Sequence, residues 1–117
     1  MTSISKKSDF SYLRENGMKK RTQMLTLVLA NSKNYDYFQS CVVASKKKVG
    51  NAVLRNRAKR RVRELIRKYS NFLKPGDLLM AITTKAVCTS RYSDLENEFL
   101  YALKKLICRE FNDCCKH

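Results

Sequence analysis

The residues best suited to chemistry are the lysines and arginines gathered in one stretch of the chain. Residues 46–68, the basic segment, contain eleven basic residues and one acid, Glu64, and so supply +10 of the net charge of +15. Such a density of cations neutralises phosphates and releases their counterions, and guanidinium groups add bidentate and stacking contacts. Solvated helices usually alternate Glu with Lys, whereas this segment has almost no acidic residues. The composition favours a polyanionic partner, with nucleic acid as the leading candidate.

The sequence shows no obvious site for general acid/base or two-metal chemistry. The chain has one histidine, His117, and lacks a close carboxylate constellation and a Gly-rich phosphate loop. Cys114 and Cys115 adjoin that histidine, but three ligands at a chain end make a weak metal site, and the five cysteines lack zinc spacing. We expect reduced thiols, no catalytic residue, no metal site and no cofactor bound by the protein alone.

The basic segment is expected to form a helix, because its apolar residues recur at helical spacing after Asn51, a candidate N-cap. The apolar stripe consists of Leu54, Ala58, Val62, Leu65, Ile66 and Tyr69. At 100° per residue, Asn56, Arg60, Arg63 and Arg67 lie opposite the stripe, flanked by Arg55, Arg57 and Lys59. The pattern predicts a cationic ridge on a helix whose other side packs on a sheet.

The first part of the chain predicts a short helix and two strands. Ser8 or Asp9 can cap a helix that Gly17 ends in a left-handed conformation. Residues 21–30 alternate between an all-leucine face and a less apolar face, with the period of a strand. Residues 37–45 are rich in aromatic and β-branched residues and predict a second strand that returns antiparallel.

The second part of the chain predicts one strand and a terminal helix. A turn at residues 75–77 precedes a continuous apolar run at 78–84, which is typical of a buried, central strand. Ser93 and Glu96 have the spacing of a capping box, and the residues after them have the spacing of an amphipathic helix. The order of elements predicts an α+β fold, a two-layer sandwich of one small sheet and its helices.

Length and composition predict one domain in the cytoplasm. With 117 residues, 44% of them hydrophobic, and no Gly/Pro-rich linker, the chain fits a single domain at 1–117 with a core at about 9–107. Its apolar stretches are far shorter than the roughly 20 residues that span a bilayer. The lysines near the amino terminus have no apolar run behind them, so no secretory signal is expected.

The basic segment also carries a resemblance to a known family. The run VGNAVLRNRAKRRVRE, with Arg55-Asn56-Arg57 at its centre, resembles the signature of the ribonuclease P protein family, and the agreement extends from about Asp9 to Ile107. The resemblance implies the order α-β-β-β-α-β-α around a four-stranded, mainly antiparallel sheet. It also implies a left-handed crossover at the basic helix, which general handedness rules disfavour.

The resemblance further implies a function. The chain would be the protein subunit of ribonuclease P, which removes the 5′ leader from precursor tRNA. The RNA subunit would hydrolyse the phosphodiester with bound magnesium, which the holoenzyme requires, while the protein would raise substrate affinity and help metal binding. Ribonuclease P RNA and precursor tRNA are the expected partners, with no membrane and no obligate protein partner.

Site residues are carried over from the resemblance by position. The catalytic RNA would contact Lys46, Lys47, Lys48, Arg55, Arg57 and Arg61, and Asn56, Lys59, Arg60, Arg63 and Arg67 lie on or near the same ridge. The single-stranded leader would lie in a groove between the basic helix and the open face of the sheet. Phe10 would offer a stacking surface, Arg14 replaces a second aromatic found in many members, and Thr26 and Val28 would form the floor.

Two other functional classes and a second role for Phe10 stay open. A non-catalytic ribosomal or RNA-chaperone protein equally needs a basic helix on a small sheet and no active site. The asparagine between two arginines after a glycine-containing turn favours ribonuclease P over that class, and a DNA-binding regulator lacks its helix-turn-helix partner. Phe10 fits a position in the core as well as a stacking surface.

Overall fold

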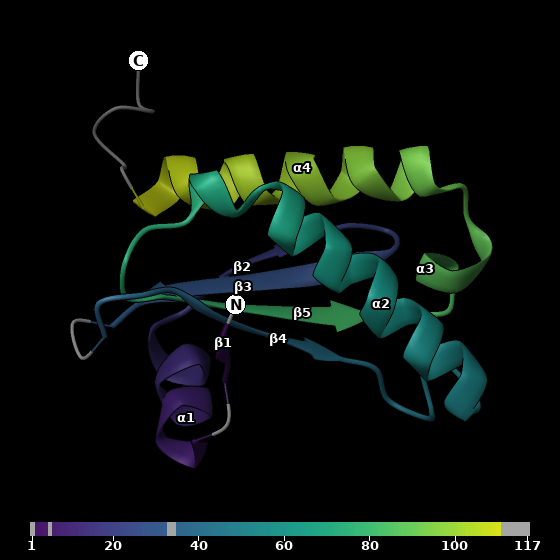
Figure 1. The fold of residues 1–117 in the computed structure, drawn as a ribbon, viewed down its shortest axis with the longest axis horizontal. Helices are drawn as coiled ribbons and strands as arrows, with labels where there is room; N and C mark the ends of the chain where they lie inside the picture. The colour runs from purple at the N-terminus through teal and green to yellow at the C-terminus, as the bar shows by residue number, and fades with distance from the viewer. Residues whose placement is uncertain (1, 5, 33–34, 111–117) are drawn as a thin grey trace.

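The computed structural model describes residues 2–4, 6–32 and 35–110. A five-stranded sheet in the order β1-β4-β5-β3-β2 has helices on both faces (Figure 1). The strands are β1 (Thr2–Ser3), β2 (Met18–Arg21), β3 (Leu25–Asn31), β4 (Gln39–Val43) and β5 (Asp77–Thr83). The helices are α1 (Lys7–Asn16), α2 (Ala52–Lys68), α3 (Ala86–Thr89) and α4 (Tyr92–Glu110), with a 3₁₀ turn η1 (Ser70–Phe72) after α2.

The sheet contains the four strands implied by the family resemblance, with the two-residue β1 added at one edge. β3 pairs antiparallel with both β2 and β5, and β4 pairs parallel with β5. The second predicted strand does run opposite to β3, but β5 lies between the two. In Figure 1, β4 and β5 point the same way and α2 passes in front of them to connect them, which makes the left-handed crossover that the resemblance implies.

The strand predicted at 21–30 is wrong at its start. Arg21 ends β2, and Thr22 turns the chain: its backbone N–H donates to the Leu25 carbonyl at 2.8 Å and its hydroxyl donates to the same oxygen at 2.9 Å. β3 begins only at Leu25. The leucines nevertheless share one face of β3, as the period of two predicted.

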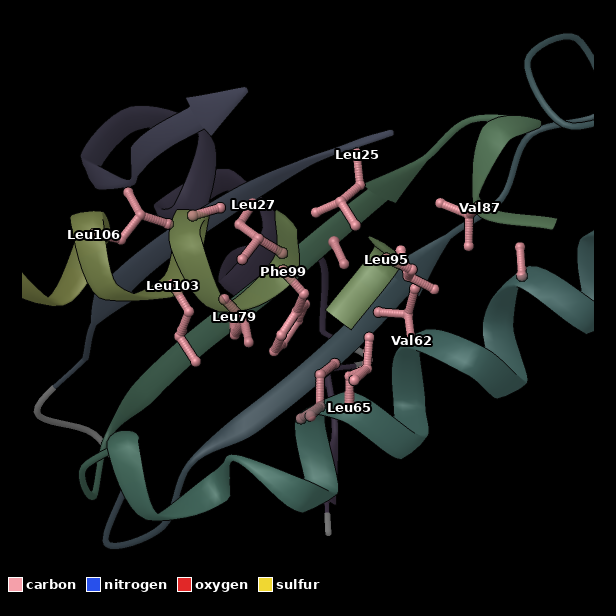
Figure 2. Close-up of a cluster of buried hydrophobic side chains, with 14 of the residues drawn as sticks. Leu25, Leu27, Val62, Leu65, Leu79, Val87, Leu95, Phe99, Leu103 and Leu106 are labelled. Carbon is pink, nitrogen blue, oxygen red and sulfur yellow. The ribbon is translucent and has the colours of Figure 1, made fainter. Parts of the chain in front are cut away.

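The leucine face of the sheet holds the larger core. Leu25, Leu27 and Leu29 pack with the apolar stripe of α2 and with α4 (Figure 2). Phe99 on α4 is fully buried in this cluster. Burial of each such side chain contributes about 1.5–3 kcal/mol, so this cluster fixes α2 and α4 on the sheet.

The predicted capping box of the last helix does not form. α4 begins at Tyr92, so Ser93 lies inside its first turn and cannot act as the N-cap. The Glu96 carboxylate accepts hydrogen bonds from the Lys68 ammonium and, at 2.6 Å, from the Tyr69 hydroxyl. Glu96 therefore joins α4 to the end of α2 instead of capping its own helix.

The opposite face of the sheet is covered in part by α1. Leu13 packs with Ile4, Val28, Ala30 and Leu78 in a second buried cluster. The prediction for the end of this helix is wrong, because Gly17 is extended at φ −74° and ψ 143°. Glycine is required there by close approach: a Cβ would lie 2.3 Å from the Leu13 carbonyl oxygen and 2.5 Å from Val28 Cγ1.

Candidate nucleic-acid interface

The cationic ridge lies on helix α2, whose N-terminus is capped and whose opposite side packs on the sheet. The Asn51 side chain accepts a hydrogen bond of 3.0 Å from the Leu54 N–H and so caps the helix as predicted. Ala58, Val62, Leu65 and Ile66 are buried on the sheet side. The opposite side of the helix is therefore turned outward.

The outer side of α2 carries two shallow hollows lined by long polar side chains. The first is lined by Val53, Asn56, Lys59, Arg60 and Arg63, and the second by Arg57, Arg60, Arg61 and Glu64. Val53 is 75% exposed in the first hollow. No carboxylate among the described residues forms an ion pair with Lys59, Arg60 or Arg63, whereas Lys68 at the helix end pairs with Glu96. The hollows thus offer unneutralised cations to an anionic partner.

Arg61 differs from its neighbours on the ridge. Its Nη1 atom donates hydrogen bonds of 2.8 Å to the carbonyl oxygens of Val87, within α3, and Ser90, which caps the end of α3. The residue is half-buried. Part of its guanidinium group therefore holds α3 against α2, and the remaining donors line the second hollow.

Arg55, in the first turn of α2, has a buried Nε atom without a hydrogen-bond partner within the described part of the chain. A buried donor left unsatisfied costs free energy that a hydrogen-bonded acceptor would recover. Arg55 lies next to Asn56 and Arg57, which are both exposed. The predicted Arg55-Asn56-Arg57 centre thus combines a buried, unsatisfied donor with two exposed side chains at the start of the ridge.

The lysine-rich connection before α2 is an ordered turn. The Val49 N–H donates to the Ser45 carbonyl at 2.9 Å, and the Lys48 N–H donates to the Ser45 hydroxyl at 3.1 Å. Gly50 follows at φ +128°, a conformation that L side chains rarely adopt. The turn leaves Lys46, Lys47 and Lys48 exposed.

A groove lies between α1 and the part of the sheet that α1 leaves open, and we call it the open-face groove. Its lining residues are Phe10, Arg14, Lys19, Val28, Val43, Met80 and Ile82. Lys19 and Ile82 also line another hollow, separate from the two on α2, whose lining includes Thr26, Thr84 and Lys48. The predicted floor residues and the lysine turn therefore lie along one path.

The sequence predicted that the groove would lie beside the basic helix. In the structure it lies on the other face of the sheet. Side chains alternate across β3, so Leu27 faces α2 and α4 while Val28 faces α1. The basic helix therefore covers the other face of the sheet, and Phe10 and Arg14 on α1 form the wall. Val28 is fully buried and Thr26 is half-buried. Phe10 is half-buried: it packs on the second cluster and part of its surface lines the groove, and its stacking on RNA stays a prediction.

A model of the family described as Ribonuclease P matches residues 2–107. The chain belongs to the ribonuclease P protein family. It is similar to the ribonuclease P protein component of Staphylococcus aureus strain Mu3, with 28% identity over 109 residues that cover 93% of this chain and 91% of the relative. The solved structure of the S. aureus RNase P protein has a TM-score of 0.77 and 26% identity, and covers 89% of this chain and 94% of that one. The RNase P protein of Thermotoga maritima shares the fold, with a TM-score of 0.75, 21% identity, and coverage of 90% and 97%.

Sequence reasoning missed part of the groove. Lys19 on β2, Val43 on β4 and Met80 and Ile82 on β5 line it beside the predicted residues. Met80 and Ile82 alternate with buried Leu79 and Ala81 along β5, which shows that this strand has a second, partly open face. The continuous apolar run concealed that alternation.

The groove side of the sheet also carries a cysteine, Cys41. Burial on β4 raises the pKa of the Cys41 thiol to about 11 and keeps it protonated at neutral pH. Within residues 2–4, 6–32 and 35–110, no His, Cys, Asp and Glu side chains gather as a metal site, and Cys114, Cys115 and His117 lie outside these residues. The helices of the described residues include none long and apolar enough to cross a membrane.

Proposed function

We propose that this chain is the protein subunit of a ribonuclease P, an endoribonuclease that removes the 5′ leader of precursor tRNA in the cytoplasm. The observation that carries the proposal is that the family match over residues 2–107 includes an exposed, unneutralised cationic ridge. Ten of the fifteen net positive charges are concentrated in the basic segment. A protein whose positive charge is concentrated on one surface binds a polyanion through that surface.

The catalytic RNA contacts the basic segment in this proposal. Lys46, Lys47 and Lys48 on the turn and Arg55 and Arg57 on the first turns of α2 bind its phosphates, and Arg61 contributes only its free donors. Asn56, Lys59, Arg60, Arg63 and Arg67 extend the contact along the ridge. Each neutralised phosphate releases counterions, so binding weakens as salt rises.

The single-stranded leader lies in the open-face groove. Phe10 stacks on a base, and Arg14 and Lys19 bind the backbone phosphates beside it. Val28, Met80 and Ile82 form the floor, and Thr26 lies in the adjoining hollow that shares Ile82. Because stacking accepts any base, this arrangement favours binding to leaders of varied sequence.

Hydrolysis is assigned to the RNA subunit, which would carry it with bound magnesium. The protein raises the affinity for precursor tRNA by holding the leader against the complex. Neither the ridge nor the groove presents a nucleophile next to a general base among the described side chains. The role of the protein is therefore binding and orientation.

Equilibrium binding to a bacterial ribonuclease P RNA tests this proposal. The variant Arg60→Ala/Arg63→Ala should bind more weakly, and the slope of log K against log salt should fall by about one to two. The matched variant Arg91→Ala/Lys104→Ala removes the same charge from two exposed positions outside the ridge and should keep affinity close to wild type. Equal losses in both variants, or equal affinity for a ribosomal RNA fragment of the same length, would favour a general RNA-binding protein.

A further inference from the structure

An exposed tyrosine lies at the edge of the molecule where β2 meets α4. Tyr101 on α4 is 51% exposed, the most exposed aromatic side chain described. A hollow beside its ring is lined by Lys20, Arg21, Thr22, Gln23, Asn97 and Glu98. Aromatic rings usually bury their surface, so a ring left open in a lined hollow offers a stacking surface.

Two cations from different elements flank this ring. The Lys20 ammonium of β2 lies 5.4 Å from the ring centroid, and the Lys105 ammonium of α4 lies 5.7 Å from it. The carboxylate of the hollow, on Glu98, already accepts a hydrogen bond of 3.2 Å from the Met24 N–H. Within the part of the chain that the structure describes, neither ammonium group forms an ion pair with a carboxylate. The hollow thus combines an open ring with two available cations, which is the chemistry that binds a nucleotide.

The Tyr101 hollow is linked to the open-face groove by lining residues that neighbouring hollows share. The groove shares Lys19 and Ile82 with the hollow that contains Thr26 and Lys48. That hollow in turn shares Arg21, Thr22 and Gln23 with the Tyr101 hollow. A path therefore runs from Phe10 along the open face and around the turn between β2 and β3 to Tyr101.

We propose that single-stranded RNA leaving the open-face groove passes around the turn at Thr22 and Gln23 and stacks a base on Tyr101. Arg21, Lys20 and Lys105 then bind the phosphates on either side of that base. This inference rests on the proposed function, because the RNA in question is the distal part of a long precursor leader. It adds a second stacking position, separate from Phe10, that only long leaders reach.

The lysines beside Tyr101 do not block the site. An exposed cation–π contact is weaker than the stacking of a base on an aromatic ring, and lysine side chains are flexible. A base can therefore displace an ammonium group from the ring face, and the displaced ammonium remains close enough to bind the adjacent phosphate. The contacts in the free protein hold the cations where the RNA backbone would pass.

Binding of precursor tRNAs with leaders of increasing length tests the proposal. The holoenzyme, assembled with a bacterial ribonuclease P RNA, should bind precursors more tightly as the leader lengthens past the groove. Tyr101→Ala should remove that further gain, by about fivefold or more, and leave short-leader and mature tRNA unchanged. Tyr101→Phe, which retains the ring, should keep the gain.

The matched control is Tyr37→Ala, which removes an aromatic side chain that is 48% exposed near the other end of the strands. This variant should keep the gain in affinity from long leaders.

The proposal is overturned if the wild-type protein gains no affinity from the longer leaders or if Tyr101→Ala gains as much as wild type. In both cases the proposed function still stands when short leaders bind more tightly with the protein than without it. If the protein raises affinity for no precursor at all, the proposed function fails and this inference fails with it.

Discussion

The Nη1 atom of Arg61 lies 2.8 Å from the carbonyl oxygen of Val87 and donates a hydrogen bond to it. The contact connects the basic helix α2 to α3, the short helix that follows β5. A charged donor bound to a carbonyl forms a stronger hydrogen bond than a neutral one. One arginine of the predicted RNA-binding set therefore also stabilises the fold that presents the others.

Arg61→Ala should lower the free energy of unfolding by about 1–3 kcal/mol, since it removes charge-assisted hydrogen bonds from a half-buried site. Arg60→Ala, one residue away and exposed, should change it by no more than about 0.5 kcal/mol. Urea denaturation of both variants measures the difference. Equal stabilities would mean that the Arg61 contacts do not hold α3 in solution.

Phe10→Ala should weaken the binding of precursor tRNA to the holoenzyme by about 1–3 kcal/mol, because the ring is proposed to stack on a leader base. The affinity for mature tRNA, which has no leader, should stay unchanged. Phe72→Ala serves as the control, since Phe72 is exposed and lies on η1, away from the residues that line the groove. If precursor and mature tRNA lose affinity equally, the packing of Phe10 on the core accounts for its effect.

Gly17→Ala should destabilise the protein by about 1–3 kcal/mol. The added Cβ would lie 2.5 Å from Val28 Cγ1 and 2.3 Å from the Leu13 carbonyl oxygen, so α1 would have to move away from the sheet. Because α1 carries a wall of the groove, the variant should also lose affinity for the leader. Denaturation together with precursor binding checks both effects, and wild-type values in both would show that the close approach is absent.

Glu96→Gln tests the contact between the ends of α2 and α4. Hydrogen bonds from Lys68 and Tyr69 lower the pKa of Glu96 below its ordinary value of 4.5. A lowered pKa stabilises the folded protein above about pH 4.5, and this contribution is lost as the pH falls through the folded-state pKa. The difference in Tm between wild type and variant should therefore be constant near neutral pH and shrink below pH 4.5. A difference that does not vary with pH would contradict the ionic role of the contact.

The features that sequence predicted well are those set by local rules. The Asn51 cap and the apolar stripe of α2 follow from the chemistry of a helix start and from a period of 3.6 residues, and both are confirmed. The cationic ridge follows from the same period. The leucine face of β3 follows from a period of two.

The features that sequence missed depend on contacts between distant residues. Nothing near residues 37–45 indicates that β5 would lie between β3 and β4, and β2 is a short polar edge strand without an apolar alternation. The sequence predicts a left-handed helix end at Gly17, whereas its constraint comes from the nearby Leu13 carbonyl and from Val28, eleven positions further along. The side of the sheet on which α1 packs determines where the groove lies, and no local pattern specifies that side.

Cleavage of a precursor tRNA by a bacterial ribonuclease P RNA at low magnesium, with and without this protein, tests the central claim most directly. We predict that the protein restores cleavage at the correct 5′ position and that Arg57→Ala/Arg60→Ala, which removes two exposed ridge cations, restores far less. Cleavage that is the same with and without the wild-type protein would contradict the assignment of this chain as a ribonuclease P subunit.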